Sequence, residues 1–270
     1  RAKVVVSCHS TISQYVPRSR DFKVRFLPSL MRLTYPWANH VVAVSSGVAD
    51  DLAHVISMPR ARIHVISNAS ITADFLGVPC ERPVHEFFDS GKPVIVAVGS
   101  LAASKDYPCL LEAFSRVIRI RDVRLIILGE GSERKKLEKL LVRLGIQKYV
   151  DIPGFINPPW PFMAASSVFV LSSAWEGLPT VLVEALALGC RIVSTDCCSG
   201  PREILEEGKF GELVPVGSAE ELSAGIVRAL ERHVDESAQQ ARARAFMPAP
   251  CANAYLPLLF DDEVAFPFLN

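Results

Sequence analysis

The sequence lacks the features that mark several large classes of protein. Its 29 Lys and Arg residues balance 29 Asp and Glu residues, so the formal net charge is zero. A neutral chain has no bulk electrostatic attraction for nucleic acid. No apolar run approaches the roughly 20 residues that a helix needs to cross a bilayer. We therefore expect no nucleic-acid partner and no membrane-spanning helix.

Cysteine is present without the spacing of a disulfide framework or a zinc site. The seven cysteines are an odd number, Cys197 and Cys198 are adjacent, and no CxxC pair occurs. This pattern predicts reduced thiols in a cytoplasmic protein. Half of the 270 residues are hydrophobic, which is enough to form the core of one or two domains.

Predicted strands and helices alternate along two parts of the chain. In the first part we expect strands at residues 3–8, 40–44 and 62–66, a basic helical stretch at about 22–36, and a helix that Ser45 or Ser46 caps and that runs to about residue 56. In the second part we expect strands at 93–98, 123–128, 149–152, 168–171, 191–194 and near 213–214, with helices at about 106–120, 133–145, 159–165, 180–188 and 219–232. This alternation predicts an α/β fold with parallel sheets and right-handed crossovers.

The most informative stretch is EGLPTVLVEALALG at residues 176–189, which follows the apolar run 168–171. Glu176 is expected in the loop after a buried strand, and Pro179 opens the next helix. Glu184 lies about one turn inside that helix, where its side chain leans back toward the N-terminus. Two carboxylates then flank a helix N-terminus that attracts phosphate. A nucleotide sugar, with hydroxyls at both ends and phosphate between them, suits this arrangement.

A Glu, seven residues and a second Glu after a strand resemble the motif of retaining glycosyltransferases of family 4, the glycosyl transferases group 1, which have the two-domain GT-B fold. The resemblance implies that Glu176 is a catalytic residue contacting the donor hexose and that Glu184 holds the nucleotide ribose. It implies that the segment between them also binds the donor, through Gly177, Leu178, Pro179, Thr180 and Val181.

Two residues near position 100 extend the resemblance. Lys105 matches the family Lys that, together with an Arg, clamps the donor diphosphate, and so is a second expected catalytic residue. Ser100 stands where the family has that Arg, and Asp106 stands where it has Gly. Because Ser carries no charge, stabilisation of the leaving group is expected to depend mainly on Lys105. The alternative is that Lys105 is an ordinary surface lysine.

Two glycine turns match segments that line the nucleotide cleft in the family. Gly129 and Glu130 resemble the Gly-Glu-Gly turn of the cleft, and Gly154 and Phe155 resemble a segment whose backbone reads the nucleotide base. Core packing is the alternative for Phe155. Glycine turns of this kind are also common in other α/β proteins.

Two further side chains have both a functional and a structural interpretation. His9 ends the first strand at a place that, in the family, points toward the donor phosphates, so it is the third expected catalytic residue; a packed or surface histidine is the alternative. Arg202 either reaches the diphosphate or pairs locally with Glu203 or Glu206.

The stretch 18–33 is basic and apolar. It contains Arg18, Arg20, Lys23, Arg25 and Arg32 with the single acid Asp21, interleaved with Phe22, Phe26, Leu30, Met31 and Leu33. Such a surface suits anionic lipid or a lipid-diphosphate acceptor, and would place the protein on the inner face of a membrane. A solvated basic face is the alternative.

The resemblance divides the chain into four parts. Residues 1–66 are expected to be the remnant of an N-terminal, acceptor-side Rossmann-like domain, and residues 67–92 a linker. Residues 93–234 are expected to form a complete Rossmann-like donor-binding domain, and residues 235–270 a helical tail that crosses back to the first domain. Because the chain begins at Arg1 without Met and has room for one complete domain of this type, we expect a truncated enzyme.

The function implied is transfer of a hexosyl unit with retention, from a nucleotide diphospho-sugar, most often UDP-linked, to a saccharide or lipid-linked acceptor in bacterial-type surface polysaccharide or lipopolysaccharide synthesis. We expect no cofactor and no metal, because no Asp-x-Asp motif appears between strands of the second domain. The Ser100 substitution and the short first domain favour an alternative, a truncated and non-catalytic nucleotide-sugar-binding module. A GT-B-like epimerase would need a pattern of acids that we do not find.

Overall fold

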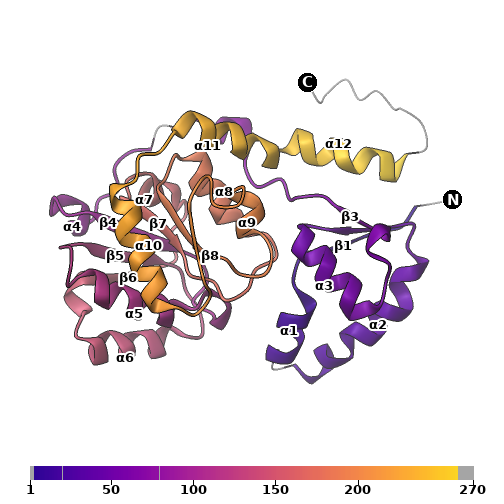
Figure 1. Cartoon of the computed structure of the whole chain (residues 1–270), viewed down its shortest axis with the longest axis horizontal. Coiled ribbons are helices and arrows are strands. Elements are labelled where there is room, and N and C mark those ends of the chain that lie inside the picture. The colour runs from indigo at the N-terminus through magenta and orange to yellow at the C-terminus, as the bar shows by residue number, and fades with distance from the viewer. Residues whose placement is uncertain (1–2, 20, 79, 261–270) are drawn as a thin grey trace.

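A computed structural model of the chain describes residues 3–19, 21–78 and 80–260, which form two parallel β-sheets (Figure 1). Arg20 of the basic stretch and residues 261–270 of the tail lie outside the described residues. Within the described part, the first sheet has the order β1-β2-β3 and the second the order β6-β5-β4-β7-β8-β9. The first sheet contains β1 (Val5–Cys8), β2 (His40–Ala43) and β3 (Ile63–Val65). The second contains β4 (Val94–Val98), β5 (Arg124–Leu128), β6 (Val150–Gly154), β7 (Val168–Leu171), β8 (Ile192–Thr195) and β9 (Glu212–Val214).

The order of the second sheet reverses at β4. The chain runs from β4 through β5 to β6, returns to the other side of β4 as β7, and continues through β8 to β9. Ile95 and Val96 of β4 pair in parallel with Val168 and Phe169 of β7. The carboxyl ends of these two strands therefore border a crevice, where open α/β sheets bind their ligands.

Helices cover both faces of the second sheet. Ile95 and Ala97 of β4 pack against one helical layer, and the alternate residues Val94 and Val96 face the other. Because both faces are buried, the strands are almost continuously apolar. The first layer contains α5 (Tyr107–Val117), α6 (Arg134–Leu144) and α10 (Ala219–Glu231), and the second contains α7 (Trp160–Ala164), α8 (Thr180–Ala187) and α9 (Pro201–Ile204). Short 3₁₀ turns η5 (Ala103–Lys105) and η6 (Gln147–Tyr149) precede α5 and β6.

The first domain differs from the sequence prediction in its helices. The stretch expected to be helical at about 22–36 is helical from Phe22 to Trp37, as three consecutive pieces of 3₁₀- and α-helix with Pro28 and Pro36 near the starts of the second and third. An additional helix precedes them. These elements are α1 (Ile12–Arg18), η1 (Phe22–Phe26), α2 (Leu27–Thr34) and η2 (Tyr35–Trp37), followed by α3 (Ser46–Ile56) and η3 (Arg60–Arg62). The cap of α3 is Ser45, whose side chain accepts a hydrogen bond from Val48 N.

The segment expected as a linker is partly core. It contains η4 (Ala73–Phe75) and α4 (Glu86–Asp89). Phe87 and Phe88 of α4 are buried, and the rings of Phe88 and Phe162 of α7 meet edge to face with centroids 5.9 Å apart. The second domain therefore begins before residue 93, because two adjacent aromatic side chains gain more by burial than by exposure.

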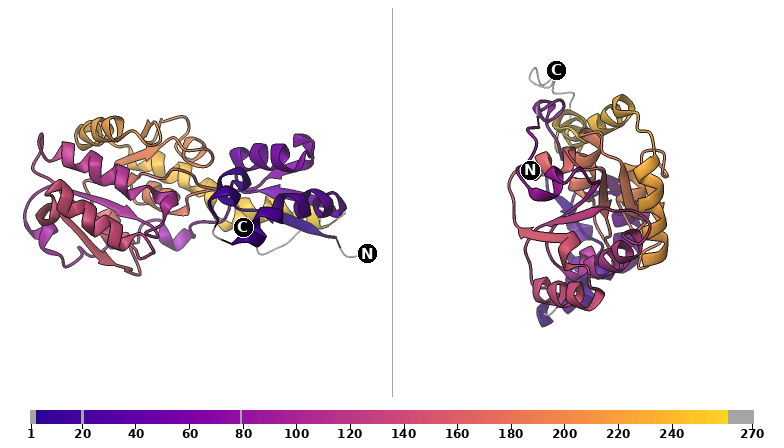
Figure 2. Two further views of the ribbon diagram at one scale, coloured as in Figure 1. Left: turned by 90° about the horizontal axis from the view of Figure 1, so that it is seen from below. Right: turned by 90° about the vertical axis from the view of Figure 1, so that its left-hand side faces the viewer.

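The C-terminal helices connect the two domains. Helix α11 (Glu236–Ala243) packs on α8, where the buried Gln239 donates to the carbonyls of Cys190 and Phe210. After η7 (Arg244–Phe246), helix α12 (Pro248–Leu259) reaches the first sheet, where Leu258 packs with Val42 and Ile66. Figures 1 and 2 show α12 in yellow extending from the second domain toward the first. The return to the first domain is thus made by α12, while α11 stays on the second.

Candidate functional site

Two adjoining cavities lie at the carboxyl ends of β4, β5 and β7. One, of about 300 Å³, is lined by residues 98–100, 128–130, 155–157 and 159. The other, of about 390 Å³, shares residues 98–100 and 159 with the first and is lined further by Lys105, Glu176, Leu178, Pro179, Thr180, Val181 and Glu184. The shared residues join the cavities into one site. The site therefore contains all of the residues predicted for it except His9, Gly154 and Gly177, which line neither cavity as described.

Glycine allows the turns around the first cavity to approach each other closely. A Cβ atom on Gly129 would lie 1.9 Å from the carbonyl oxygen of Gly99, and Gly129 N donates to the Gly154 carbonyl at 2.8 Å. The turns after β4, β5 and β6 are thus in contact through their main chains, which leaves backbone groups at the edge of the cavity. Any larger residue at position 129 would separate them.

Phe155 lies on the surface of the first cavity and not in the core. Its side chain is 76% exposed and lines the cavity. The nearby Glu130 carboxylate is held by the Arg134 guanidinium, with Nη2–Oε1 and Nε–Oε2 distances of 2.6 and 2.9 Å. Those hydrogen bonds lower the pKa of Glu130. An open aromatic face beside backbone donors and acceptors is suited to a planar heterocycle.

Lys105 and Glu176 form an ion pair inside the second cavity. Lys105 Nζ lies 2.5 Å from Glu176 Oε1, and the two side chains are only 17% and 14% exposed. Ser173 Oγ donates to the same carboxylate oxygen at 2.6 Å, and Ser172 Oγ donates to the Lys105 carbonyl at 2.7 Å. The loops after β4 and β7 therefore hold these two side chains together, and Lys105 is not an ordinary surface lysine.

Helix α8 begins at this cavity without a side-chain cap. Its N-cap residue is Pro179, whereas α3, α5, α10 and α11 are capped by Ser45, Asp106, Ser218 and Asp235. The N–H groups of its first turn lie where the cavity is lined by Thr180 and Val181. An uncapped helix N-terminus offers free N–H donors and positive potential to an anion.

Glu184 lies one turn inside α8 and also lines the second cavity. Burial raises the pKa of its carboxyl group. A half-buried carboxylate is stabilised by hydroxyl groups that donate to it, so Glu184 is suited to bind a diol.

His9 and Arg202 were each expected to have either a functional or a structural role. The structure shows where each of the two side chains lies. His9 is exposed at the end of β1, and its carbonyl lies so close to Gly177 that a Cβ atom there would be 2.0 Å from the oxygen. Arg202 forms ion pairs with Asp196 and Glu207, so it is paired locally, although with neither of the acids expected.

Side chains with no predicted interdomain role join the two domains here. Ser45 Oγ donates to the Gly177 carbonyl at 2.9 Å, and the Glu203 carboxylate accepts hydrogen bonds from Ser46 N and Gly47 N at 3.0 and 3.2 Å. The N-cap pattern left Ser45 and Ser46 as alternatives, and the bond from Ser45 to Gly177 spans 132 positions and leaves no local signal.

The other candidate chemistries have little support in the described residues. All seven cysteines are free thiols, and burial raises the pKa of Cys197 to about 12. No cluster of three or more His, Cys, Asp or Glu side chains suitable for a metal ion occurs within the described ranges. No helix in this part of the chain has the length and apolar character needed to cross a membrane.

Comparison with known proteins identifies relatives along most of the chain. The model for glycosyl transferases group 1 matches residues 81–246, and that for glycosyltransferase family 4 matches residues 1–72. A Campylobacter jejuni protein, N-acetylgalactosamine-N,N'-diacetylbacillosaminyl-diphospho-undecaprenol 4-alpha-N-acetylgalactosaminyltransferase, is 32% identical over 90% of this chain and 65% of its own. The lipopolysaccharide core biosynthesis glycosyltransferase LpsE of Rhizobium meliloti is 37% identical over 68% of this chain and 51% of its own.

Solved structures share the fold. A mutant of S. aureus TarM in complex with Fondaparinux, alpha-GlcNAc-glycerol and UDP has a TM-score of 0.71 at 17% identity, covering 96% of this chain and 51% of TarM. The lipopolysaccharide outer core galactosyltransferase WaaB has a TM-score of 0.70 at 21% identity, covering 95% of this chain and 75% of WaaB. The chain spans from about a third to about two thirds of the length of the first curated relatives it matches. It belongs to the family of glycosyl transferases group 1 and has the α/β architecture of the GT-B fold.

Proposed function

We propose that this protein transfers a hexosyl unit from a nucleotide diphospho-sugar, with UDP as the favoured nucleotide, to a saccharide or lipid-linked acceptor, with retention at the anomeric carbon. One observation carries the proposal. The two cavities share residues, and together they are lined by an open aromatic face, a half-buried carboxylate, an uncapped helix N-terminus and a Lys–Glu pair. A nucleotide sugar presents a base, a diol, a diphosphate and a hexose, which these groups can bind.

In this proposal the nucleoside spans the two cavities, with its base in the first and its ribose in the second. The base lies against Phe155 and the main-chain groups near Gly129 and Gly154, and Glu184 accepts hydrogen bonds from the ribose hydroxyls. The first-turn N–H groups of α8, at Thr180 and Val181, bind the diphosphate. Ser100 lines both cavities and adds one neutral hydrogen bond there.

The chemistry proposed is positioning and charge stabilisation without a protein nucleophile. The acceptor hydroxyl attacks the anomeric carbon on the face from which the nucleoside diphosphate departs. Lys105 and the α8 N-terminus take up the negative charge that develops on the leaving diphosphate, so we propose that no metal ion is needed. Glu176 contacts the hexose and holds Lys105 until phosphate replaces it as partner. His9, at the end of β1, is proposed to approach the phosphates from the first domain.

The acceptor class is inferred from the relatives. The name of the C. jejuni protein specifies a diphospho-undecaprenol-linked acceptor, and that of LpsE specifies lipopolysaccharide core biosynthesis. Structures of Anabaena HepE contain UDP with glucose and UDP-glucose. We propose a role in surface polysaccharide or lipopolysaccharide synthesis at the cytoplasmic face of a membrane.

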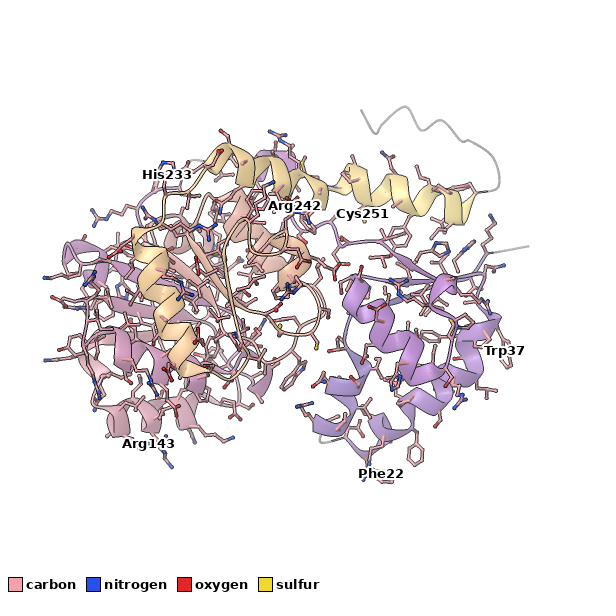
Figure 3. All side chains as sticks on the ribbon, in the orientation of Figure 1. Phe22, Trp37, Arg143, His233, Arg242 and Cys251 are labelled. Carbon is pink, nitrogen blue, oxygen red and sulfur yellow. The ribbon has the colours of Figure 1, made fainter. Side chains whose placement is uncertain are left out.

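The first domain carries a surface that fits this location. Five large apolar side chains of η1, α2 and η2 are exposed, from 57% for Leu30 to 75% for Trp37; the others are Phe22, Phe26 and Leu33. Their spacings of four, four, three and four residues place them along one helical stripe. Figure 3 shows Phe22 and Trp37 pointing outward from the first domain.

Positive charges accompany this stripe. Lys23, Arg25 and Arg32 are exposed, and Asp21 is the single acid between residues 21 and 40. The Arg25 guanidinium lies over the Phe22 ring at 5.9 Å. Exposed apolar groups beside cations favour an anionic bilayer over a solvated basic face, since water does not stabilise the exposed rings.

A non-catalytic nucleotide-sugar-binding module is the second candidate. Ser100 and the pairing of Lys105 with Glu176 favour it, because both reduce the positive charge available to a leaving diphosphate.

The test is calorimetric titration of the 270-residue chain with UDP, followed by analysis of UDP-hexose incubated with the chain and undecaprenyl-diphosphate-linked acceptor. We expect UDP binding and a glycosylated lipid with the anomeric configuration of the donor. UDP binding without transfer would favour the module, an epimerised sugar nucleotide would indicate an epimerase, and absence of UDP binding would overturn both proposals.

A further inference from the structure

The loop that carries Glu176 accepts hydrogen bonds from two side chains of the first domain. Thr11 Oγ1 donates to the Glu176 carbonyl at 3.4 Å, and Ser45 Oγ donates to the Gly177 carbonyl at 2.9 Å. These two hydroxyl-bearing residues are 2% and 0% exposed. Within the second domain, Ser199 Oγ donates to the same Glu176 carbonyl at 2.9 Å. Two successive carbonyls of the loop therefore have partners in the first domain.

The fit between this loop and the first domain leaves no space for a side chain. The hypothetical Cβ atom on Gly177 would lie 2.0 Å from the His9 carbonyl oxygen, and one on Gly47 would lie 2.6 Å from the Ser199 Cβ atom. Beside the loop, the Arg18 guanidinium lies over the Trp175 ring, 4.6 Å from its centroid. Any displacement of one domain relative to the other would move the loop or break these contacts.

Glu203 fixes the same junction from the second domain. Its carboxylate accepts hydrogen bonds from Ser46 N and Gly47 N, the first N–H groups of α3. A carboxylate at a helix N-terminus is stabilised by the free N–H groups and the helix dipole. Helix α3 is therefore capped by Ser45 from its own domain and by Glu203 from the other.

The two ends of the site differ in whether they contact this domain junction. Under the proposed function, the first cavity is the nucleobase end of the site, and Glu176 marks the sugar end. The first cavity is lined by residues between 98 and 159, all in the second domain, and none of them bonds to Thr11 or Ser45 among the described contacts. Glu176, by contrast, has its carboxylate in the second cavity and its carbonyl bonded to Thr11.

We propose that Thr11 and Ser45 are positioning residues for Glu176, so that docking of the first domain orders the sugar end of the site, whereas the first cavity is formed by the second domain alone. The identity of the ligand rests on the proposed function, but the ordering of the loop does not. Contact between the domains would thereby couple recognition of the sugar to the presence of the domain expected to bind the acceptor.

The first measurement is hydrogen exchange of the amides in residues 172–178 of the ligand-free chain. Thr11→Val keeps the shape of the side chain and removes its hydroxyl, while Thr11→Ser keeps the hydroxyl. We expect about three- to tenfold faster exchange in Thr11→Val and in Ser45→Ala, and near wild-type exchange in Thr11→Ser.

Because Ser45→Ala also removes a helix cap, Asp235→Ala, which uncaps α11, is the matched control and should leave the exchange of residues 172–178 unchanged. Unchanged exchange in Thr11→Val and Ser45→Ala, or equal effects of Thr11→Val and Thr11→Ser, would overturn the proposal.

The second measurement is calorimetric titration with UDP and with UDP-glucose, UDP-galactose and their N-acetylhexosamine counterparts. In Thr11→Val and Ser45→Ala we expect unchanged affinity for UDP and a roughly three- to tenfold loss of the preference for the best UDP-hexose over UDP. Equal loss for UDP and UDP-hexose would contradict the separation of the two ends. If wild-type protein binds none of these ligands, the proposed function fails, and the exchange measurement alone decides the positioning role.

Discussion

At the scale of single residues, Glu184 links stability to ligand binding. We expect Glu184→Gln to weaken UDP binding by about 1.5–3 kcal/mol, because charge-assisted hydrogen bonds from two ribose hydroxyls are replaced by weaker ones. Calorimetric titration with UDP checks this, with Glu112→Gln on the exposed face of α5 as the control. Equal UDP affinity of Glu184→Gln and the wild type would rule out the assigned role.

The same substitution is expected to raise the thermal stability of the ligand-free protein at neutral pH. Because burial raises the pKa of Glu184 in the folded state, the native protein favours the protonated carboxyl. The stability that the folded protein gains from this protonated carboxyl is fully present below the pKa that Glu184 has in the unfolded chain. It is lost as the pH rises through the pKa of the folded state. The Tm difference between Glu184→Gln and wild type should therefore be positive at pH 7 and shrink toward pH 4. A difference that grows on acidification would mean that the sign of the pKa shift is wrong.

Substitutions of Lys105 and of Glu176 should differ in their effects on the affinity for UDP. Removal of Lys105 as Lys105→Ala eliminates the cation that lines the second cavity, and we expect UDP affinity to fall by about 1.5–3 kcal/mol. Glu176→Ala frees Lys105 from its ion pair, so UDP affinity should be maintained or increased while discrimination between UDP-hexoses is lost. Titration of both variants with UDP and the UDP-hexose panel checks this. Much weaker binding of UDP itself by Glu176→Ala would refute the assignment.

At the scale of elements, the first turn of α8 can be tested by deleting a single N–H. Thr180 is the first residue of the helix, where Pro is tolerated, and Pro179 before it has the extended backbone that a following Pro requires. Thr180→Pro should weaken UDP binding by about 1 kcal/mol and leave uridine binding unchanged, since one donor to phosphate is lost. Thr180→Ala keeps the N–H and is the control. Equal affinity of Thr180→Pro and Thr180→Ala for UDP would argue against phosphate at this helix end.

The stripe on η1, α2 and η2 predicts binding to anionic vesicles. We expect the chain to co-sediment with vesicles of phosphatidylcholine and phosphatidylglycerol and not with phosphatidylcholine alone. Leu30→Gln with Leu33→Gln should reduce the partition coefficient at least about tenfold, because two leucine side chains that enter the bilayer contribute a few kcal/mol to membrane binding. Ile120→Gln with Val142→Gln, at positions that are 58% and 64% exposed on the second domain, is the matched control. Equal effects of the two pairs, or binding to both kinds of vesicle alike, would contradict a specific anionic docking surface.

At the scale of the whole molecule, the second domain is expected to fold and bind nucleotide alone. Residues 81–247 include α4, the second sheet and α11, and they contain every residue that lines the two cavities. A fragment of this length buries its own core and should unfold in one cooperative transition. We expect it to bind UDP within about threefold of the full chain, to lose preference for the UDP-hexose, and to lose vesicle binding. Calorimetry and vesicle sedimentation check these outcomes; failure to bind UDP in a folded fragment would place part of the nucleotide site in the first domain.

The sequence alone determined the fold class, the family and most of the elements. Strands of parallel sheets are buried on both faces, so apolar runs such as residues 168–171 predict them directly. The helices α5, α6, α7, α8 and α10 were expected within a few residues of their observed ends, whereas the short helices α4 and α9 were not predicted. The motif from Glu176 to Glu184 is local, since a strand, a loop and a helix mouth follow one another along the chain, and its functional assignment remains a prediction for the titrations above.

Only the tertiary structure decided which side chains meet. The pairing of Lys105 with Glu176 joins loops 71 residues apart, and that of Ser45 with Gly177 joins the two domains. Phe155 is of a residue type common in cores, yet it lies exposed at a cavity. Phe87 and Phe88 lie in a predicted linker, yet they are buried. Periodicity reports the face of one element, whereas these outcomes depend on which elements pack together, and packing is set by long-range contacts that leave no local pattern in the sequence.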